Sequence, residues 1–267
     1  MDVHLITVGT SILRNFVDLK DEEAFINKHK MKDWHKIDPE DDRQKKIESL
    51  AFRGNEVFEK LLEYVNKRPK EASAELNAFY AFNRLSKPSD VEVYLYSTET
   101  GTGWLCANVL YYHLNDKGFK VQQPIKLKGF GKGILSFDEA LLEVIDKVVR
   151  LIKSKKNQGF RVFINATAGF KPESAFMVIA SMLAGADQAY YIHEAFKEIV
   201  AIPLLPLVVE PKYVEALKFL KEPLPRYMAK ESLMYKGLDL DDLRDRGLIK
   251  EGEYIMLREW VRKLLES

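Results

Sequence analysis

The stretch RVFINATAGFKPESAFMVIASMLAGA, residues 161–186, sets the architecture of the chain. It opens with a short apolar run, Arg161 to Asn165, and ends in a segment that is apolar almost all round, Pro172 to Ala184. The first predicts a buried strand and the second a central helix. The loop between them supplies an amide, a hydroxyl, a glycine, a lysine and a helix-starting proline. A plain connection needs only a glycine or a cap, so we expect this loop to bind a ligand.

The same alternation of short apolar runs and longer segments of helical period extends through the chain. It is the pattern of a mainly parallel sheet with helices on both faces, so we predict a Rossmann-like α/β fold. A last run, Ile199 to Val209, contains two prolines and is expected at a sheet edge or as a hairpin arm. The other predicted strands are Val3–Val8, Val91–Ser97, Val121–Leu127, Arg161–Asn165 and Gln188–His193.

The connection between the first two predicted strands is unusually long. We expect a charged loop from Lys20 to Asp42 and a second helix near Glu71 to Leu85. Between them, apolar residues at helical spacing predict one more helix, with Phe58, Leu61, Leu62 and Val65 on its buried face. This region therefore reads as an insertion or an elaborated crossover.

Composition limits the classes of function. The 267 residues include 46% hydrophobic residues, which is enough for a sizeable core. The 41 basic and 40 acidic side chains nearly balance, so no overall charge attracts the chain to DNA or to anionic lipid. The single cysteine, Cys106, excludes a disulfide framework and suits a reducing compartment. We see no signal peptide and no apolar run of about 18 residues, so we expect a soluble cytoplasmic protein.

Four of the predicted strands end in loops rich in glycine, hydroxyls or lysine: GTS (9–11), STETGTG (97–103), KGFGKG (128–133) and NATAGFKPE (165–173). The carboxyl ends of parallel strands meet at one edge of a sheet, so these loops should form one site. Glycines let a backbone approach a ligand, while hydroxyls, helix N-termini and lysine favour an oxyanion. The chemistry points to phosphate, and a carboxylate substrate remains open.

Two common nucleotide motifs are absent. The chain has no Gly-x-x-x-x-Gly-Lys-Ser/Thr, and Gly101-Thr-Gly103 reaches Cys106 where the dinucleotide motif requires glycine or alanine. An NTPase or a nicotinamide enzyme is therefore disfavoured.

Single residues of these loops allow more than one interpretation. Ser11 could be a helix cap, whereas Lys171 is poorly placed for the helix dipole unless an anion binds beside it. Glu173 is explained by that dipole, and Lys132 is either a phosphate contact or a solvated lysine. Trp104 could stack on a base, but core packing is the better interpretation.

The sequences VGTS, STETGTG, NATAGFKPE and GADQAYYIHE together resemble those of CRISPR-associated Rossmann-fold (CARF) proteins, and most of all the archaeal ring nucleases. The similarity covers about residues 1–210. It implies a homodimeric sensor of cyclic oligoadenylate, with Ser11 and Lys171 at the positions that assist cleavage of the ring. The expected ligand-binding residues are Gly9, Thr10, Ser97, Thr98, Glu99, Gly101, Thr102, Gly103, Lys132, Asn165, Thr167, Ala168, Gly169 and Phe170.

A cyclic tetra-adenylate suits a two-fold dimer, because each subunit can present one set of loops to half of the ring. RNA carries its own nucleophile, the ribose 2′-hydroxyl, so the protein needs mainly to hold it in line and to stabilise charge. We therefore expect cleavage without a metal or other cofactor. Alternatives are a non-catalytic receptor acting through a partner and a ligand-controlled transcription factor.

Residues 211–267 are expected to form a small separate unit after a first domain of residues 1–210. Within it, GLIKEGEYIML predicts a β-hairpin between helices, an order similar to a winged helix. Its 12 Lys/Arg and 11 Asp/Glu give a net charge of +1, so we expect no strong DNA binding. About 57 residues without a histidine are too few for the HEPN ribonuclease domain of many CARF effectors, so a complete chain of this length would be no such effector.

Overall fold

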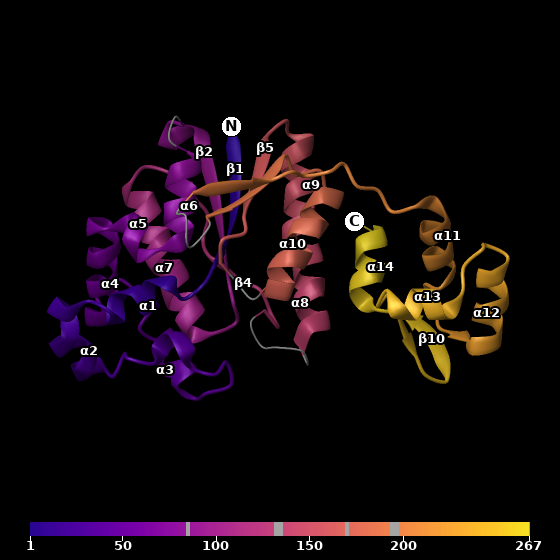
Figure 1. Ribbon diagram of the computed structural model, residues 1–267, viewed down its shortest axis with the longest axis horizontal. Coiled ribbons are helices and arrows are strands. Elements are labelled where there is room, and N and C mark those ends of the chain that lie inside the picture. The colour runs from indigo at the N-terminus through magenta and orange to yellow at the C-terminus, as the bar shows by residue number, and fades with distance from the viewer. Residues whose placement is uncertain (84–85, 131–135, 169–170, 193–197, 267) are drawn as a thin grey trace.

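The computed structural model describes residues 1–83, 86–130, 136–168, 171–192 and 198–266. Within these ranges its centre is a seven-stranded sheet between two layers of helices (Figure 1), which confirms the predicted α/β class. The strands are β1 (Asp2–Val8), β2 (Val91–Ser97), β3 (Lys120–Val121), β4 (Ile125–Lys126), β5 (Arg161–Asn165), β6 (Gln188–Ile192) and β7 (Ile199–Ile202). Their order across the sheet is β3–β2–β1–β5–β6–β7, with β4 also paired to β2. Among the described strands of this sheet, β7 pairs antiparallel with β6 and lies at the end of the order, so it is the predicted edge strand. It ends at Ile202, where Pro203 follows, short of the predicted Val209.

The two faces of the sheet are covered by different helices. Along β1, Val3 and Leu5 point into one core cluster, while Ile6 and Val8 point into the other. Because both faces of the strand are buried, its sequence is an apolar run rather than an alternation. One layer contains α1 (Ser11–Val17), α4 (Glu56–Lys67), α5 (Pro69–Ala72), α6 (Ala74–Phe82) and α7 (Gly101–Asp116). The other contains α8 (Phe137–Glu143), the π-helical η5 (Val144–Val149), α9 (Arg150–Asn157) and α10 (Lys171–Leu183).

The predicted strand Val121–Leu127 is wrong as a single element. The structure has two short strands instead, and the break between them includes Pro124. Proline has no backbone N–H to donate to a neighbouring strand, so it interrupts the ladder.

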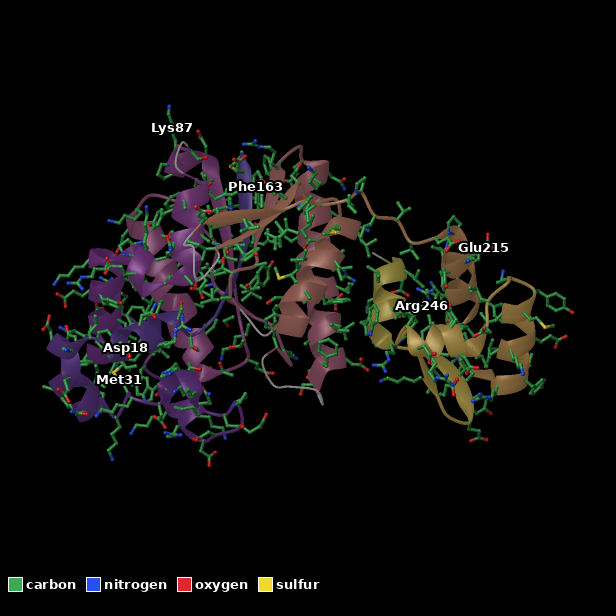
Figure 2. The ribbon with its side chains drawn as sticks, viewed as in Figure 1. Asp18, Met31, Lys87, Phe163, Glu215 and Arg246 are labelled. Carbon is green, nitrogen blue, oxygen red and sulfur yellow. The ribbon has the colours of Figure 1, made fainter. Side chains whose placement is uncertain are left out.

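The predicted charged loop Lys20–Asp42 is also wrong, because this segment is largely helical. Its apolar side chains Ile26, Met31 and Trp34 are buried in the core beside α1 and α4. Figure 2 labels Met31, which lies within this layer of helices. This burial supplies the stabilisation that a charged loop would lack. Its elements are η1 (Lys20–Glu22), α2 (Glu23–His29) and η2 (Trp34–Lys36), followed by α3 (Arg43–Glu48) and, after α6, by η3 (Pro88–Asp90).

The C-terminal residues have a core cluster of their own. Residues 203–210 lead without helix or strand to a group of helices and a three-stranded antiparallel sheet. Its hairpin, β9 (Ile249–Glu251) and β10 (Tyr254–Leu257), confirms the hairpin expected there. The remaining elements are α11 (Pro211–Phe219), β8 (Leu224–Pro225), α12 (Arg226–Met234), α13 (Leu240–Asp245) and α14 (Glu259–Glu266). The division at residue 210 stays a prediction.

The C-terminal unit rests on the helices of the second layer. Asp138 of α8 accepts hydrogen bonds from Arg258 over 2.7 Å and pairs with Lys250 over 3.2 Å. Phe176 of α10 packs edge-on against Trp260, with ring centroids 5.3 Å apart. In the described part of the chain, every helix is too short or too polar to cross a lipid bilayer.

Candidate ligand-binding site

A cavity of about 1080 Å³ opens at the carboxyl edge of the sheet. The loops after β1, β2 and β5 form its floor, as the topology predicts for parallel strands. The insertion between β1 and β2 forms a further wall that the sequence did not lead us to expect. The described lining residues are Gly9, Thr10, Ser11, Arg14, Val17, Asp18, Lys32, His35, Lys36, Ile37, Ala74, Thr98, Thr100, Thr102, Thr167 and Ala168.

Four basic side chains of the lining form what we call the basic wall: Arg14, Lys32, His35 and Lys36. Arg14 lies on α1, and the other three lie on the segment that joins α2 to α3. Asp18 is the one acidic side chain among the described lining residues. The cavity is therefore positively charged although the whole chain is nearly neutral.

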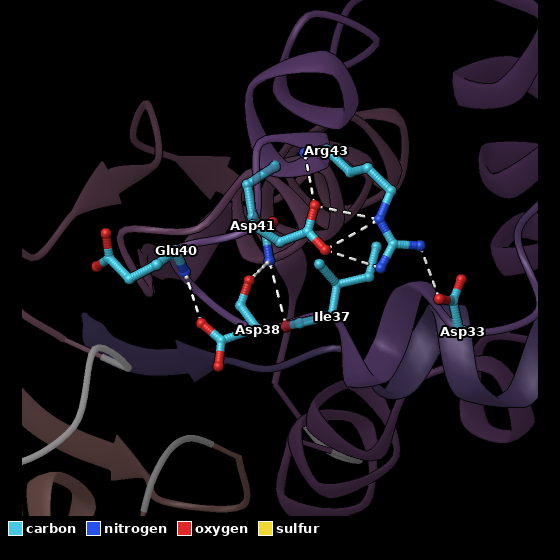
Figure 3. Close-up of polar contacts among 7 residues, drawn as sticks. Asp33, Ile37, Asp38, Glu40, Asp41 and Arg43 are labelled. Carbon is cyan, nitrogen blue, oxygen red and sulfur yellow. Dashed lines mark hydrogen bonds and ion pairs between the residues drawn. The ribbon is translucent and has the colours of Figure 1, made fainter.

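The segment behind the basic wall is held by its own ion pairs (Figure 3). Arg43 donates to Asp41 through Nε and Nη2 and reaches Asp33 through Nη1 over 2.7 Å. The Gln44 amide donates to the carbonyl oxygens of Ile37 and Asp38. These contacts close the turn at residues 37–41, and so fix the direction of the segment that carries Lys32 and Lys36.

His35 is the one side chain of the basic wall whose ordinary pKa lies near neutral pH. Burial lowers its pKa, Lys36 and Arg14 lower it further, and Asp18 and Asp33 oppose them. The imidazole is therefore neutral at pH 7. An anionic ligand would reverse part of this shift, because negative charge stabilises the imidazolium.

Ser11 lies at the start of α1 and is held by a buried carboxylate. Its Oγ donates to Oε2 of Glu75 over 2.7 Å and accepts from the Ala74 amide over 3.3 Å. The other carboxylate oxygen, Oε1, accepts from the Gly9 amide over 2.7 Å. Glu75 is 1% exposed. The Gly9 amide and the Ser11 hydroxyl therefore both donate to Glu75, while Gly9, Thr10 and Ser11 all line the cavity.

The loop after β2 contributes hydroxyls. Thr98 and Thr100 are joined through their Oγ1 atoms over 2.7 Å, and Thr100 caps α7 by accepting from the Gly103 amide over 3.1 Å. Thr102 lies two residues further along, where its amide donates to Gln44 over 3.0 Å. Three hydroxyls at the N-terminus of a 16-residue helix suit an anion.

Several residues predicted for this loop do not reach the cavity. Gly101 and Gly103 are buried by packing: a Cβ would lie 1.9 Å from Gln44 O at the first and 2.2 Å from Thr98 Oγ1 at the second. Ser97 is fully buried, and Glu99 accepts from the Gly129 amide over 2.9 Å. The glycines therefore serve close approach within the protein.

The loop after β5 is tied down by hydrogen bonds. Asn165 accepts from both the amide and the hydroxyl of Thr167, and its Nδ2 donates to Glu75 O over 3.0 Å. Thr7 and Ser174 both donate to the Ala168 carbonyl oxygen. Asn165 is fully buried and positions the loop, whereas Thr167 and Ala168 line the cavity.

Most of the remaining predicted residues, or their side chains, lie outside the described part of the chain, and one described residue lies away from the cavity. The α10 helix begins at Lys171, as the proline beside it predicts, but the side chain of Lys171 lies outside the described residues, as does that of Glu173. Lys132, Gly169, Phe170 and His193 also lie outside them. Trp104 is half-buried, with the Lys126 ammonium 4.9 Å from its ring centroid, and is not among the described lining residues.

Glu75 and the basic wall were not predicted from the sequence. Glu75 stands in the first turn of a helix, where a carboxylate is commonplace, and nothing local marks it as buried. The charges of the insertion alternate in sign, so lysines that face the cavity look like any others. A Glu two residues after Ser73, which caps α6, was the one available signal.

The sequence model of a protein family described as CRISPR-associated protein (Cas_APE2256) matches residues 70–205. The match covers just over half of the 267-residue chain. It spans Glu75 and the loops after β2 and β5, but not Ser11 or the basic wall.

Proposed function

Because this chain belongs to the CRISPR-associated protein family Cas_APE2256, we propose that its cavity binds cyclic oligoadenylate and cleaves it. The ligand is a cyclic tetra-adenylate held across a homodimer in the cytoplasm. Cleavage of the ring removes a messenger of type III CRISPR defence. The protein is then a ring nuclease that ends the signal.

The observation that carries this proposal is the cavity at the carboxyl edge of the sheet. Its volume of about 1080 Å³ lies just above the range of roughly 300–1,000 Å³ that serves small ligands. Hydroxyls from the loops after β1, β2 and β5 line the same cavity as the cations of the basic wall. Hydroxyls and cations in one cavity suit a ligand with several phosphates, such as an oligonucleotide ring.

The reaction follows from the chemistry of RNA. The ribose 2′-oxygen attacks the adjacent phosphorus, the bond from phosphorus to the 5′-oxygen breaks, and a 2′,3′-cyclic phosphate end remains. Ser11, which lines the cavity, aligns the reacting ribose or phosphate, and Lys171, at the start of α10, meets the charge on the leaving oxygen. Neither role needs a metal ion.

A single experiment tests the activity. The purified protein is incubated with radiolabelled cyclic tetra-adenylate, and the products are separated on a denaturing gel. Linear adenylates with 2′,3′-cyclic phosphate ends are expected. An intact ring after many hours, with binding seen by calorimetry, would replace the nuclease with a receptor.

One contact favours the receptor as a second candidate. The helix that begins at Lys171 is α10, and Phe176, less than two turns further along, packs against Trp260 of the C-terminal unit. A ligand that shifts the start of α10 could therefore change how that unit sits, with a partner protein or DNA as the target. The small net charge of residues 211–267 argues against tight DNA binding. Nanomolar affinity for one promoter sequence would favour the transcription factor.

A further inference from the structure

Glu75 is a buried carboxylate that the proposed reaction has not yet used. It is 1% exposed, and it lies in the first turn of α6, about 64 residues after Ser11 in the sequence. Its Oε1 accepts from the Gly9 amide, and its Oε2 accepts from the hydroxyls of Ser11 and Ser73, each over 2.7 Å. A buried carboxylate with three donors is firmly placed, because each bond offsets part of its desolvation.

These bonds determine the polarity of the Ser11 hydroxyl. A serine hydroxyl has one proton and two lone pairs. The proton points to Glu75, and one lone pair accepts from the Ala74 amide over 3.3 Å. In the described part of the chain no other group bonds this oxygen, so its second lone pair faces the cavity that Ser11 lines. Ser11 therefore presents an acceptor to the ligand rather than a donor.

We infer that Glu75 is a positioning residue that makes Ser11 the proton acceptor for the 2′-hydroxyl of a bound oligoribonucleotide. This inference rests on the proposed function. The 2′-hydroxyl donates to Ser11 Oγ. As the 2′-oxygen bonds to phosphorus, its proton passes to Ser11 Oγ and the proton of Ser11 passes to Glu75 Oε2. The leaving 5′-oxygen takes a proton from water, and Glu75 returns its own to solvent, so charge and protons balance.

A Ser11 that only contacted a phosphate would need the opposite polarity. A phosphate oxygen carries no proton, so it would need the Ser11 proton that Glu75 already holds. The arrangement thus favours a ligand donor, which a ribose has and a deoxyribose lacks at the 2′ position.

The test separates binding from cleavage with an isosteric change. In Glu75→Gln the amide nitrogen would donate to Ser11 Oγ and turn the hydroxyl proton to the cavity. We expect the dissociation constant for cyclic tetra-adenylate to stay within about threefold, while the single-turnover cleavage rate falls about 10²-fold, a typical loss for a proton-transfer group. Glu71→Gln on the exposed surface of α5 is the matched control and should cleave at the wild-type rate.

A double-variant comparison shows whether Glu75 acts through Ser11. Ser11→Ala with Glu75→Gln should cleave no more slowly than Ser11→Ala alone, because the two act as one unit. Glu75→Asp keeps the charge and should recover at least tenfold of the rate lost in Glu75→Gln. If Glu75→Gln does not fold, Glu75→Asp alone and with Ser11→Ala gives the same comparison.

The outcomes distinguish the inference from the function it rests on. Two results would overturn the role of Glu75 while the wild-type protein still cleaves the ring. Either Glu75→Gln cleaves at the wild-type rate, or the rate losses of Ser11→Ala and Glu75→Gln multiply in the double variant. The ring-nuclease function would stand in both cases. A wild-type protein that does not cleave the ring overturns both.

Discussion

Gly101 and Gln44 touch backbone to backbone, although 57 residues separate them. A Cβ on Gly101 would lie 1.9 Å from the Gln44 carbonyl oxygen, and the Gln44 side chain accepts from the neighbouring Thr102 amide over 3.0 Å. This contact seats α3 of the insertion against the start of α7. It thereby sets the distance between the basic wall and the hydroxyls after β2.

Gly101→Ala should therefore loosen the insertion. The methyl group cannot fit against a carbonyl oxygen, so we expect a loss of about 1–3 kcal/mol in the free energy of unfolding, measured in urea. Gly252→Ala in the exposed hairpin turn is the control, since a Cβ there would lie 3.8 Å from the nearest atom, Tyr254 O, and the change should stay within about 0.5 kcal/mol. Equal unfolding midpoints for the two variants would show that α3 does not depend on this contact.

Removing one cation of the basic wall should weaken the binding of cyclic tetra-adenylate. Charge-assisted hydrogen bonds contribute about 1.5–3 kcal/mol, so Lys36→Ala should raise the dissociation constant roughly tenfold or more and flatten its salt dependence. Lys45→Ala on the outer side of α3, where the lysine is 90% exposed, should change neither. Calorimetry at two salt concentrations makes the comparison. An unaltered affinity in Lys36→Ala would place the phosphates elsewhere in the cavity.

Lys171→Ala should slow cleavage far more than it weakens binding. Loss of one preorganised donor costs about 10²- to 10³-fold in rate, whereas binding is shared among many groups. Ser11→Ala should also slow cleavage, and Lys230→Ala in the C-terminal unit serves as the control.

The same assay in excess EDTA tests the metal-free reaction. Cleavage by the wild-type protein should continue, with 2′,3′-cyclic phosphate ends as first products. Loss of activity in EDTA contradicts this mechanism. If Lys171→Ala cleaves the ring at the wild-type rate, the loop after β5 only binds the ligand.

Stability should fall as the solution is acidified below pH 6.5. Burial lowers the pKa of His4 to about 3 and that of His113 to about 4, where an unfolded histidine has about 6.5. The unfolded chain thus binds more protons between these values. Each histidine should remove about 2 kcal/mol from the free energy of unfolding between pH 6.5 and pH 5. Urea unfolding across this range measures the loss, and above pH 7 both contributions should be constant.

His113→Gln should lessen that pH dependence while lowering stability at pH 7. The imidazole bonds both Asn66 over 2.6 Å and Tyr80 over 2.8 Å, and glutamine cannot reproduce both contacts. If the free energy of unfolding of His113→Gln falls as steeply below pH 6.5 as that of the wild type, His113 is not among the groups responsible.

Asp138→Asn should free the C-terminal unit from α8. Burial raises the pKa of Asp138, but hydrogen bonds from Arg258 and Lys250 outweigh it, so the net pKa is lowered and the group is ionised at pH 7. Without that charge we expect faster proteolysis in residues 203–210. Asp241→Asn, whose partner Arg244 lies on its own helix, is the control. Equal cleavage rates would show that the packing of Phe176 on Trp260 suffices.

Local patterns in the chain were enough for the sheet and for the edge that carries the site. Strands β2 and β5 begin and end where their apolar runs do, because a strand buried on both faces must be apolar throughout. The parallel order then brings Ser11, Thr98 and Thr167 to one cavity, since the carboxyl ends of such strands share an edge. The single strand predicted at Val121–Leu127 is divided into β3 and β4, because Pro124 has no backbone N–H to donate to the ladder.

The residues that contact the predicted site residues could be identified only in the folded chain. Glu75 meets Ser11 through the packing of α6 beside β1, and Gln44 meets Thr102 through the packing of α3 against α7. Such contacts join segments some 60 residues apart, and each depends on how whole helices bury their apolar faces. The immediate sequence neighbours of a charged residue do not reveal that packing. The sequence therefore shows that Lys36 and Glu75 are charged, but not that Lys36 lines the cavity or that Glu75 is buried beside Ser11.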